Sequence, residues 1–103
     1  MVEIQYKNQK YQFKEIETID LLVAQNMMPT GYIFLDSEGQ PRKPNTPEEI
    51  EKAAEGQSIL YLYIIARLSV SPKITFTQLN KDPALFAKIM ETLGPQLREH
   101  FFL

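Results

Sequence analysis

The residues best placed to do chemistry are four glutamates, Glu48, Glu49, Glu51 and Glu55. On a helix, Glu48, Glu51 and Glu55 share one face, which is the least that an acid–base pair or a hard-cation site requires. However, three of the four fall in the first turns of a well-capped helix, where carboxylates offset the positive end of the helix dipole. Lys52 also offers Glu48 a partner one turn further on. We therefore interpret the cluster as helix-stabilising and predict no catalytic residue and no metal site.

Three lysines near the N-terminus, Lys7, Lys10 and Lys14, lie among aromatic residues, a combination that can bind nucleic acid. Alternation along the chain places the aromatic side chains on the face opposite most of these lysines. The net charge is −2 and the isoelectric point is near 5.4, so the chain lacks the basic surface that phosphates require. We interpret the lysines as a solvated outer face that discourages edge-to-edge pairing, and expect no nucleic-acid partner.

Residue types that are missing exclude further chemistry. The chain has no cysteine and one histidine, His100, which argues against disulfides, thiolate or multi-histidine metal sites and nucleophilic triads. The longest apolar stretch, residues 59–66, has eight residues, whereas a membrane span needs about 18–20. The four glycines are scattered singly, so no phosphate-binding loop is present. We expect a non-enzymatic protein with no cofactor and no membrane partner, located in the cytoplasm.

The elements that position the remaining candidates begin with a β-hairpin. Apolar and polar residues alternate over residues 2–6 and 11–14, with a turn near Asn8. The predicted apolar face of this hairpin carries Val2, Ile4, Tyr6, Tyr11 and Phe13. An isolated hairpin is barely stable in water, so this face must cover other elements.

A first helix is predicted from Thr18 to about Met28. Thr18 is suited to cap it, and Asp20 lies in the opening turn, where the helix dipole favours a negative charge. Ile19, Leu22 and Val23 recur at helical spacing.

The segment after this helix contains a short aromatic run and then prolines. Residues 32–35 are a candidate third strand beside the hairpin. Pro41, Pro44 and Pro47 then recur every third residue, which suits a polyproline connector and also matches the pattern that SH3-type grooves bind. We favour the stiff connector.

The strongest structural signal is a long central helix. Thr46, Pro47 and Glu49 form a capping box with proline at the first helical position. One apolar face then continues over about six turns to Leu68, and Gly56 is a candidate break within it. Residues 59–65 are apolar on nearly all sides of the helix. A single small domain has too few other elements to cover so much apolar surface, and this excess predicts self-association.

The remainder of the chain predicts a connector and a last helical region. Ser71 and Pro72 stop the central helix, and the connector that follows carries buried anchors. The last helix begins near Asp82, buries Leu85, Phe86, Ile89 and Leu93, and is ended or broken by Gly94 and Pro95.

The predicted fold class is therefore α+β, with an N-terminal β-hairpin packed on a mainly helical body of three to four helices. The 103 residues, 44% of them hydrophobic, correspond to one domain. We divide it into residues 1–35, a connector at 36–46 and a helical region at 47–103. The candidate partner-binding residues are the apolar groups with the fewest expected covering elements: Met27, Met28, Tyr61, Ile64, Ile65, Leu68, Phe101, Phe102 and Leu103.

The order of these parts resembles the small tail assembly chaperones of long-tailed bacteriophages. The resemblance is carried by the aromatic–lysine step at residues 11–14 (YQFK), by residues 65–75 (IARLSVSPKIT), and by the short closing helix at residues 83–93. It implies a non-enzymatic protein that coats a helical tape measure protein, recruits tail tube subunits and forms homo-oligomers, in the host cytoplasm if phage-encoded. A rival interpretation is a small acidic inhibitor or regulator that binds a host or bacterial protein through its β face.

Overall fold

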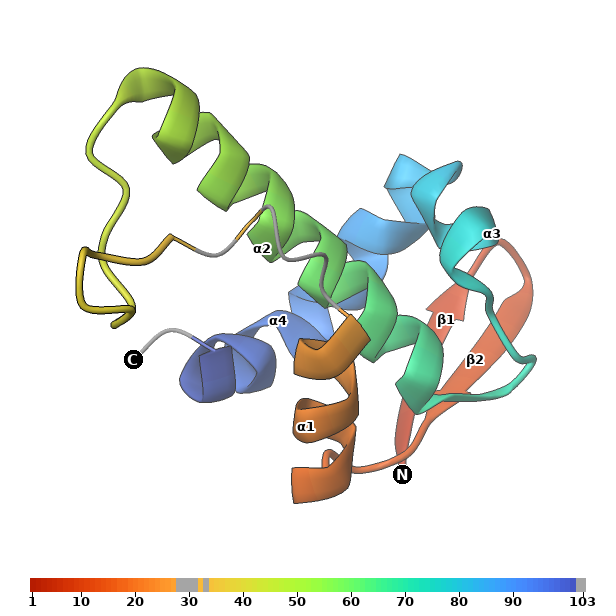
Figure 1. Cartoon of the computed structure of the whole chain (residues 1–103). Helices are drawn as coiled ribbons and strands as arrows, with labels where there is room; N and C mark the ends of the chain where they lie inside the picture. Colours follow the sequence, from red (N-terminus) through yellow and green to blue (C-terminus); the bar gives the residue numbers. More distant parts are fainter. Residues whose placement is uncertain (28–31, 33, 102–103) are drawn as a thin grey trace.

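A computed structural model describes residues 1–27, 32 and 34–101 of the chain. Its elements are β1 (Val2–Tyr6), β2 (Gln9–Phe13), α1 (Thr18–Met27), α2 (Pro47–Leu68), β3 (Ser69–Ser71), α3 (Phe76–Asn80) and α4 (Pro83–Phe101). The predicted α+β class is confirmed, because the described residues form one three-stranded antiparallel sheet and four helices. Figure 1 shows α2 running across the molecule, with its C-terminal end near the sheet and its N-terminal end away from the other helices.

The predicted hairpin is confirmed, with a tighter turn than the sequence indicated. Ile4 lies opposite Tyr11, and Lys7 and Asn8 alone make the turn, with φ angles of 49° and 62°. Two adjacent residues in the left-handed region are typical of the type I′ turn, whose twist matches that of the strands. Because the turn takes only two residues, β2 starts earlier than expected, and Phe13 at its end is fully buried.

The third strand of the sheet comes from a different segment than predicted. The candidate strand at residues 32–35 contributes, within the described residues, one β-bridge between Leu35 and Pro41, and Ile33 lies outside those residues. Strand β3 follows α2 directly and pairs with β2, while the Lys14 N–H donates to the Leu68 carbonyl at 2.9 Å. The end of the central helix thus delivers the third strand to the hairpin.

Helix α2 is continuous over 22 residues and passes through Gly56 without a break. The Thr46 hydroxyl caps it by accepting from the Glu49 N–H at 3.1 Å. The reciprocal bond of the predicted capping box is replaced, because the Glu49 carboxylate accepts from the Asn45 N–H and from the Arg42 guanidinium. Gly56 is buried because the Tyr32 side chain covers it.

The C-terminal half of α2 is the centre of the core. Its fully buried residues pack with residues of the sheet, α3 and α4 in one cluster: Phe13, Ile64, Ile65, Leu68, Leu79, Ile89, Leu93 and Leu97. Every residue of the apolar segment 59–65 is buried or half-buried by its own chain. The prediction of surplus exposed apolar surface on this helix is therefore wrong, because its apolar residues share one core cluster with residues of the sheet, α1, α3 and α4.

Helix α4 continues through Gly94 and Pro95, where the sequence predicted an end or a break. Leu93 and Leu97, one turn apart on either side of the proline, are both buried, so the core holds the two halves of the helix together. Figure 1 shows α4 bending along its course, as expected where a proline removes a helical hydrogen bond.

The Gly56→Ala variant tests the packing of Tyr32 on α2. A Cβ atom at position 56 would lie 2.8 Å from the Tyr32 Cβ and 3.0 Å from its Cγ, so Tyr32 must move and its hydrogen bond to Glu55 is lost. Alanine normally stabilises a helix interior by about 1 kcal/mol relative to glycine. We expect that gain to be absent in urea unfolding.

The matched control is Ala54→Gly at an exposed position of the same helix, which calibrates the intrinsic helix term at about 1 kcal/mol. If Gly56→Ala raised the free energy of unfolding by as much as Ala54→Gly lowered it, the described packing would be wrong.

Candidate partner-binding site

The geometry of the site depends on one buried carboxylate, that of Asp20. Its side chain is 0% exposed and lies between β2, α1 and α2. The Lys14 ammonium donates to its two oxygens at 2.8 and 2.9 Å, the Arg67 Nε donates at 2.7 Å, and the Glu17 N–H donates at 2.9 Å. The bond from Glu17 also shows how α1 begins: Asp20 reaches back to satisfy the first free N–H, so the predicted cap at Thr18 is wrong.

The charge on Asp20 is retained at neutral pH. Burial alone would raise the pKa of Asp20, but hydrogen bonds from Lys14, from the Glu17 backbone and from Arg67 together lower it below the ordinary value of 3.8. The interpretation of Lys14 as part of a solvated outer face is therefore wrong, because this lysine points at a buried anion. Two cations share one buried anion here, which leaves the cluster with a net positive charge, offset at its exposed edge by Glu17, 3.6 Å from the Lys14 ammonium.

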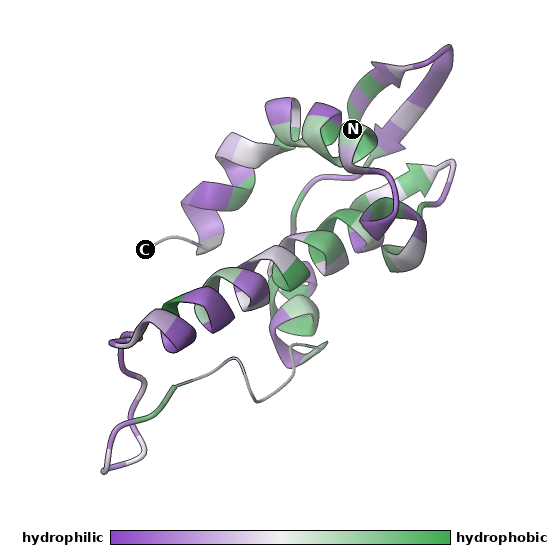
Figure 2. Cartoon of the chain, turned by 90° about the horizontal axis from the view of Figure 1, so that it is seen from above, coloured by the Kyte–Doolittle hydropathy of each residue, from purple (hydrophilic) through white to green (hydrophobic). Residues whose placement is uncertain are grey.

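These bonds fix the rotation of α1 about its axis and leave some of its apolar side chains exposed. Asp20 and Ala24 face the core, while Ile19, Leu22 and Met27 are 54%, 50% and 49% exposed. Figure 2 shows that α1 is rich in hydrophobic residues, as is the C-terminal half of α2. Leu21 and Val23 are half-buried, so α1 carries apolar residues on both its buried and its exposed sides, whereas an ordinary amphipathic helix is polar on its exposed side.

An apolar groove opens beside the C-terminal end of α1. It has a volume of about 340 Å³ and lies between α1, α2 and the start of α3. Apolar, aromatic and basic side chains line it: Met27, Tyr63, Ala66, Arg67, Lys73 and Phe76. The Tyr63 and Phe76 rings contact each other with their centroids 4.6 Å apart, so they form one aromatic surface.

The structure separates the predicted partner-binding residues into three groups. Met27 lies at the groove and is exposed. Four of the others, Tyr61, Ile64, Ile65 and Leu68, are core residues and are not accessible to a partner, which corrects that part of the prediction. Phe101 ends α4, and Met28, Phe102 and Leu103 lie outside the described residues.

Sequence reasoning missed Tyr63, Arg67, Lys73 and Phe76 as groove residues. No local pattern marks them, because they come from one helix, a connector and the start of another helix. The exposure of Ile19 and Leu22 was equally hidden, since helical spacing shows that two residues share a face and not which way that face points. The available signal was Asp20, an aspartate among apolar residues in the first half of the helix.

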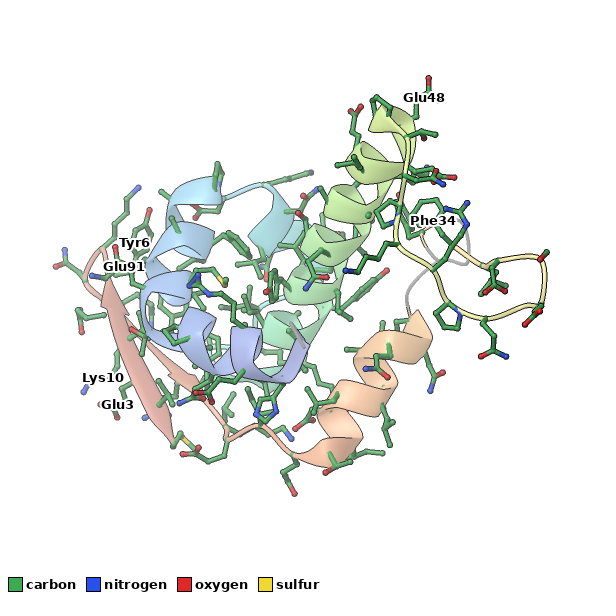
Figure 3. The ribbon with its side chains drawn as sticks, turned by 90° about the vertical axis from the view of Figure 1, so that its left-hand side faces the viewer. Glu3, Tyr6, Lys10, Phe34, Glu48 and Glu91 are labelled. Atoms are coloured by element: carbon green, nitrogen blue, oxygen red, sulfur yellow. The ribbon has the colours of Figure 1, made fainter. Side chains whose placement is uncertain are left out.

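The acidic cluster holds a loop on α2. The Arg42 guanidinium binds the Glu49 carboxylate through two bonds of 2.8 and 2.9 Å, and with the Asn45 N–H it lowers the pKa of Glu49 to about 2. The Tyr32 hydroxyl donates to Glu55 at 3.0 Å. Glu48 points away from the tip of α2 (Figure 3). Within the described residues, no group of three or more acidic or histidine side chains could hold a metal ion.

The hairpin and the proline connector give no further site. Glu3 and Lys10 face each other on the outer side of the hairpin, with 3.8 Å between their charged atoms (Figure 3). Pro41 and Pro44 line a hollow on α2, so this part of the connector faces its own helix. No helix in the described ranges is long and apolar enough to cross a membrane.

Comparison of the chain with protein-family models, with curated proteins and with solved structures gave no significant match.

The Asp20→Asn variant tests the ion cluster. It keeps the shape of the side chain but leaves Lys14 and Arg67 without their anion, and we expect the free energy of unfolding at pH 7 to fall by about 2 kcal/mol or more. The folded-state pKa of Asp20 is lowered, so its contribution is complete above pH 3.8 and is lost as the pH falls below that value. Urea unfolding from pH 7 to pH 2 should show wild type and variant converging in acid.

Glu17→Gln is the control, because Glu17 is exposed and the substitution removes only its ion pair with Lys14, whose charged atoms are 3.6 Å apart. We expect the free energy of unfolding to change by about 0.5 kcal/mol or less. A difference between wild type and Asp20→Asn that stayed constant over the whole pH range would contradict the assignment.

Proposed function

We propose that this chain is a non-enzymatic, protein-binding assembly chaperone that holds an apolar helical segment of another protein. The observation that carries the proposal is the exposure of three large apolar side chains on α1, those of Ile19, Leu22 and Met27. Exposed apolar groups that gather on one element are typical of interaction surfaces. The nearby groove offers the same partner a second contact.

The physical fit is to a helix lying against a helix. Ile19 and Leu22, three residues apart on α1, can pack against the apolar stripe of a partner helix, which is the usual way that an amphipathic helix is recognised. Met27 connects this face with the groove, and methionine adapts to partner side chains of different shape. Such a surface suits a long partner that offers many similar segments.

The resemblance to tail assembly chaperones supplies a candidate partner. In that setting, copies of the chain bind along the tape measure protein, keep its apolar surface from aggregating and recruit tail tube subunits. Self-association belongs to the same proposal. Its support is now the exposed apolar residues of α1, because the apolar segment of the central helix is covered by its own chain. A location in the host cytoplasm follows from the phage setting.

The rival interpretation, an acidic regulator that binds through its β face, has less support from the geometry. The outer side of the hairpin is occupied by polar contacts within the chain, since Glu3 pairs with Lys10 and accepts from the Gln12 amide at 3.1 Å. Its large apolar residues, Ile4 and Phe13, are buried. A partner would find little apolar area there to cover.

The double variant Ile19→Gln/Leu22→Gln tests the proposal. Both positions are about half exposed, so the stability of the fold should change by about 0.5 kcal/mol or less. We expect that co-expression of the wild-type chain with a phage tape measure protein keeps that protein soluble. The double variant should lower the soluble fraction about tenfold, because two apolar anchors are lost.

The matched control is Ile50→Gln, the same change at a residue 56% exposed near the start of α2. It should behave as wild type. A tape measure protein that gained no solubility from the wild-type chain would contradict the chaperone role, and equal losses with Ile50→Gln would contradict the assignment of the surface to α1.

A further inference from the structure

We infer that the groove beside α1, here the Arg67 groove, selects a helical segment that carries an acidic side chain among its apolar ones. This inference rests on the proposed function and names the chemistry of the partner. Three features of the molecule support it: the apolar lining of the groove, the free edge of the Arg67 guanidinium and the excess of positive charge around the groove.

The lining of the groove fixes an apolar contact. Met27, Tyr63 and Phe76 surround it from three different elements, and Ala66 lies one helical turn from Tyr63 along α2. A small residue between larger ones leaves room for a partner side chain. The groove, about 340 Å³ in volume, can take one or two leucine-sized side chains of a helix laid against it.

Arg67 presents an unused hydrogen-bonding edge. Its Nε donates to Asp20 at 2.7 Å, and among the residues that the structure describes, no acceptor is bound to its two terminal nitrogens. The side chain is 37% exposed and lines the groove. A guanidinium held by one edge keeps the planar fork that matches a carboxylate, so the contact with Asp20 orients Arg67 for a second anion.

The charge around the groove favours the same partner. Lys73 lines it and donates to the carbonyls of Ala66, Arg67 and Ser69 at 3.0–3.3 Å, which are neutral acceptors at the end of α2. Lys14 is a further cation nearby, because it binds the same Asp20 carboxylate as Arg67. The second carboxylate beside Lys14 is that of the exposed Glu17. Around the groove, the cations of Lys14, Arg67 and Lys73 outnumber the carboxylates of Asp20 and Glu17 by one, which favours acidic segments over basic ones.

A protein segment fits this groove better than a nucleic acid. The Tyr63 and Phe76 rings contact each other at an interplanar angle of 34°, so they do not present two open ring faces to successive bases. Backbone phosphates would also require a row of cations, whereas Arg67 and Lys73 flank an apolar floor. A single carboxylate between apolar residues satisfies both kinds of group at once.

The experiment uses two fluorescein-labelled helical peptides of about 18 residues, with leucines at helical spacing and either one glutamate or one glutamine between them. Fluorescence anisotropy with the full chain should show about fivefold tighter binding of the glutamate peptide. Arg67→Lys keeps a cation for Asp20 but removes the fork, and we expect it to lower this preference to about twofold or less. Met27→Gln should weaken both peptides by a similar factor and leave the preference unchanged.

Lys73→Gln provides a second test if Arg67→Lys unfolds the chain, and it too should lower the preference for glutamate. Lys88→Gln, at a half-exposed lysine on α4 that does not line the groove, is the matched control and should leave the preference intact. Equal affinity of wild type for the two peptides, or a preference that survives both groove variants, would overturn the inference. Displacement of the glutamate peptide by a single-stranded oligonucleotide at equal concentration would also overturn it.

The outcome is separable from that of the proposed function. If the tape measure protein is kept soluble but neither peptide distinguishes Arg67→Lys from wild type, the chaperone role stands and the acidic selectivity fails. If the tape measure protein is not kept soluble while the glutamate preference depends on Arg67, the groove is an acidic-peptide site and the phage role fails.

Discussion

The burial of the Asp20 carboxylate constrains the rest of the structure. An ionised group in a protein interior is tolerated only when its hydrogen-bonding capacity is filled and its charge is balanced. Lys14, Arg67 and the Glu17 N–H meet that demand, and each comes from a different place: the end of β2, the last turn of α2 and the start of α1. The three elements therefore keep one mutual arrangement, because any large shift would leave a buried charge unpaired.

That constraint explains why Ile19 and Leu22 of α1 lie outside. A helix can bury only one side against a single neighbour, and here the side with Asp20 and Ala24 is the buried one. Ile19 and Leu22 follow to the solvent side, at the cost of apolar exposure that a purely structural helix would avoid. The same ion cluster orients Arg67 beside the groove, so one set of bonds stabilises the fold and shapes the surface that we assign to a partner.

The two halves of α2 differ in how far they are buried. The C-terminal half is enclosed by the sheet, α3 and α4, and its apolar residues are used up in the core. The N-terminal half is exposed at Ile50 and is covered on one side by a loop, through the Arg42–Glu49 ion pair and the contact of Tyr32 with Gly56. Apolar content along a helix therefore does not identify a binding surface, since the richest segment is also the most completely covered.

The sequence by itself determined the α+β class, the hairpin with its apolar face, the start of α2 at its threonine cap, and the burial of Leu85, Ile89 and Leu93. Each of these follows from short-range physics: alternation, capping and helical spacing act within a few residues. Only the tertiary structure decided the origin of β3, the continuation of α4 through Pro95, the covering of the central helix and the exposure of Ile19 and Leu22 on α1. These depend on which surfaces meet across the chain, and a buried ion pair between residues 20 and 67 leaves no periodic trace in the order of the amino acids.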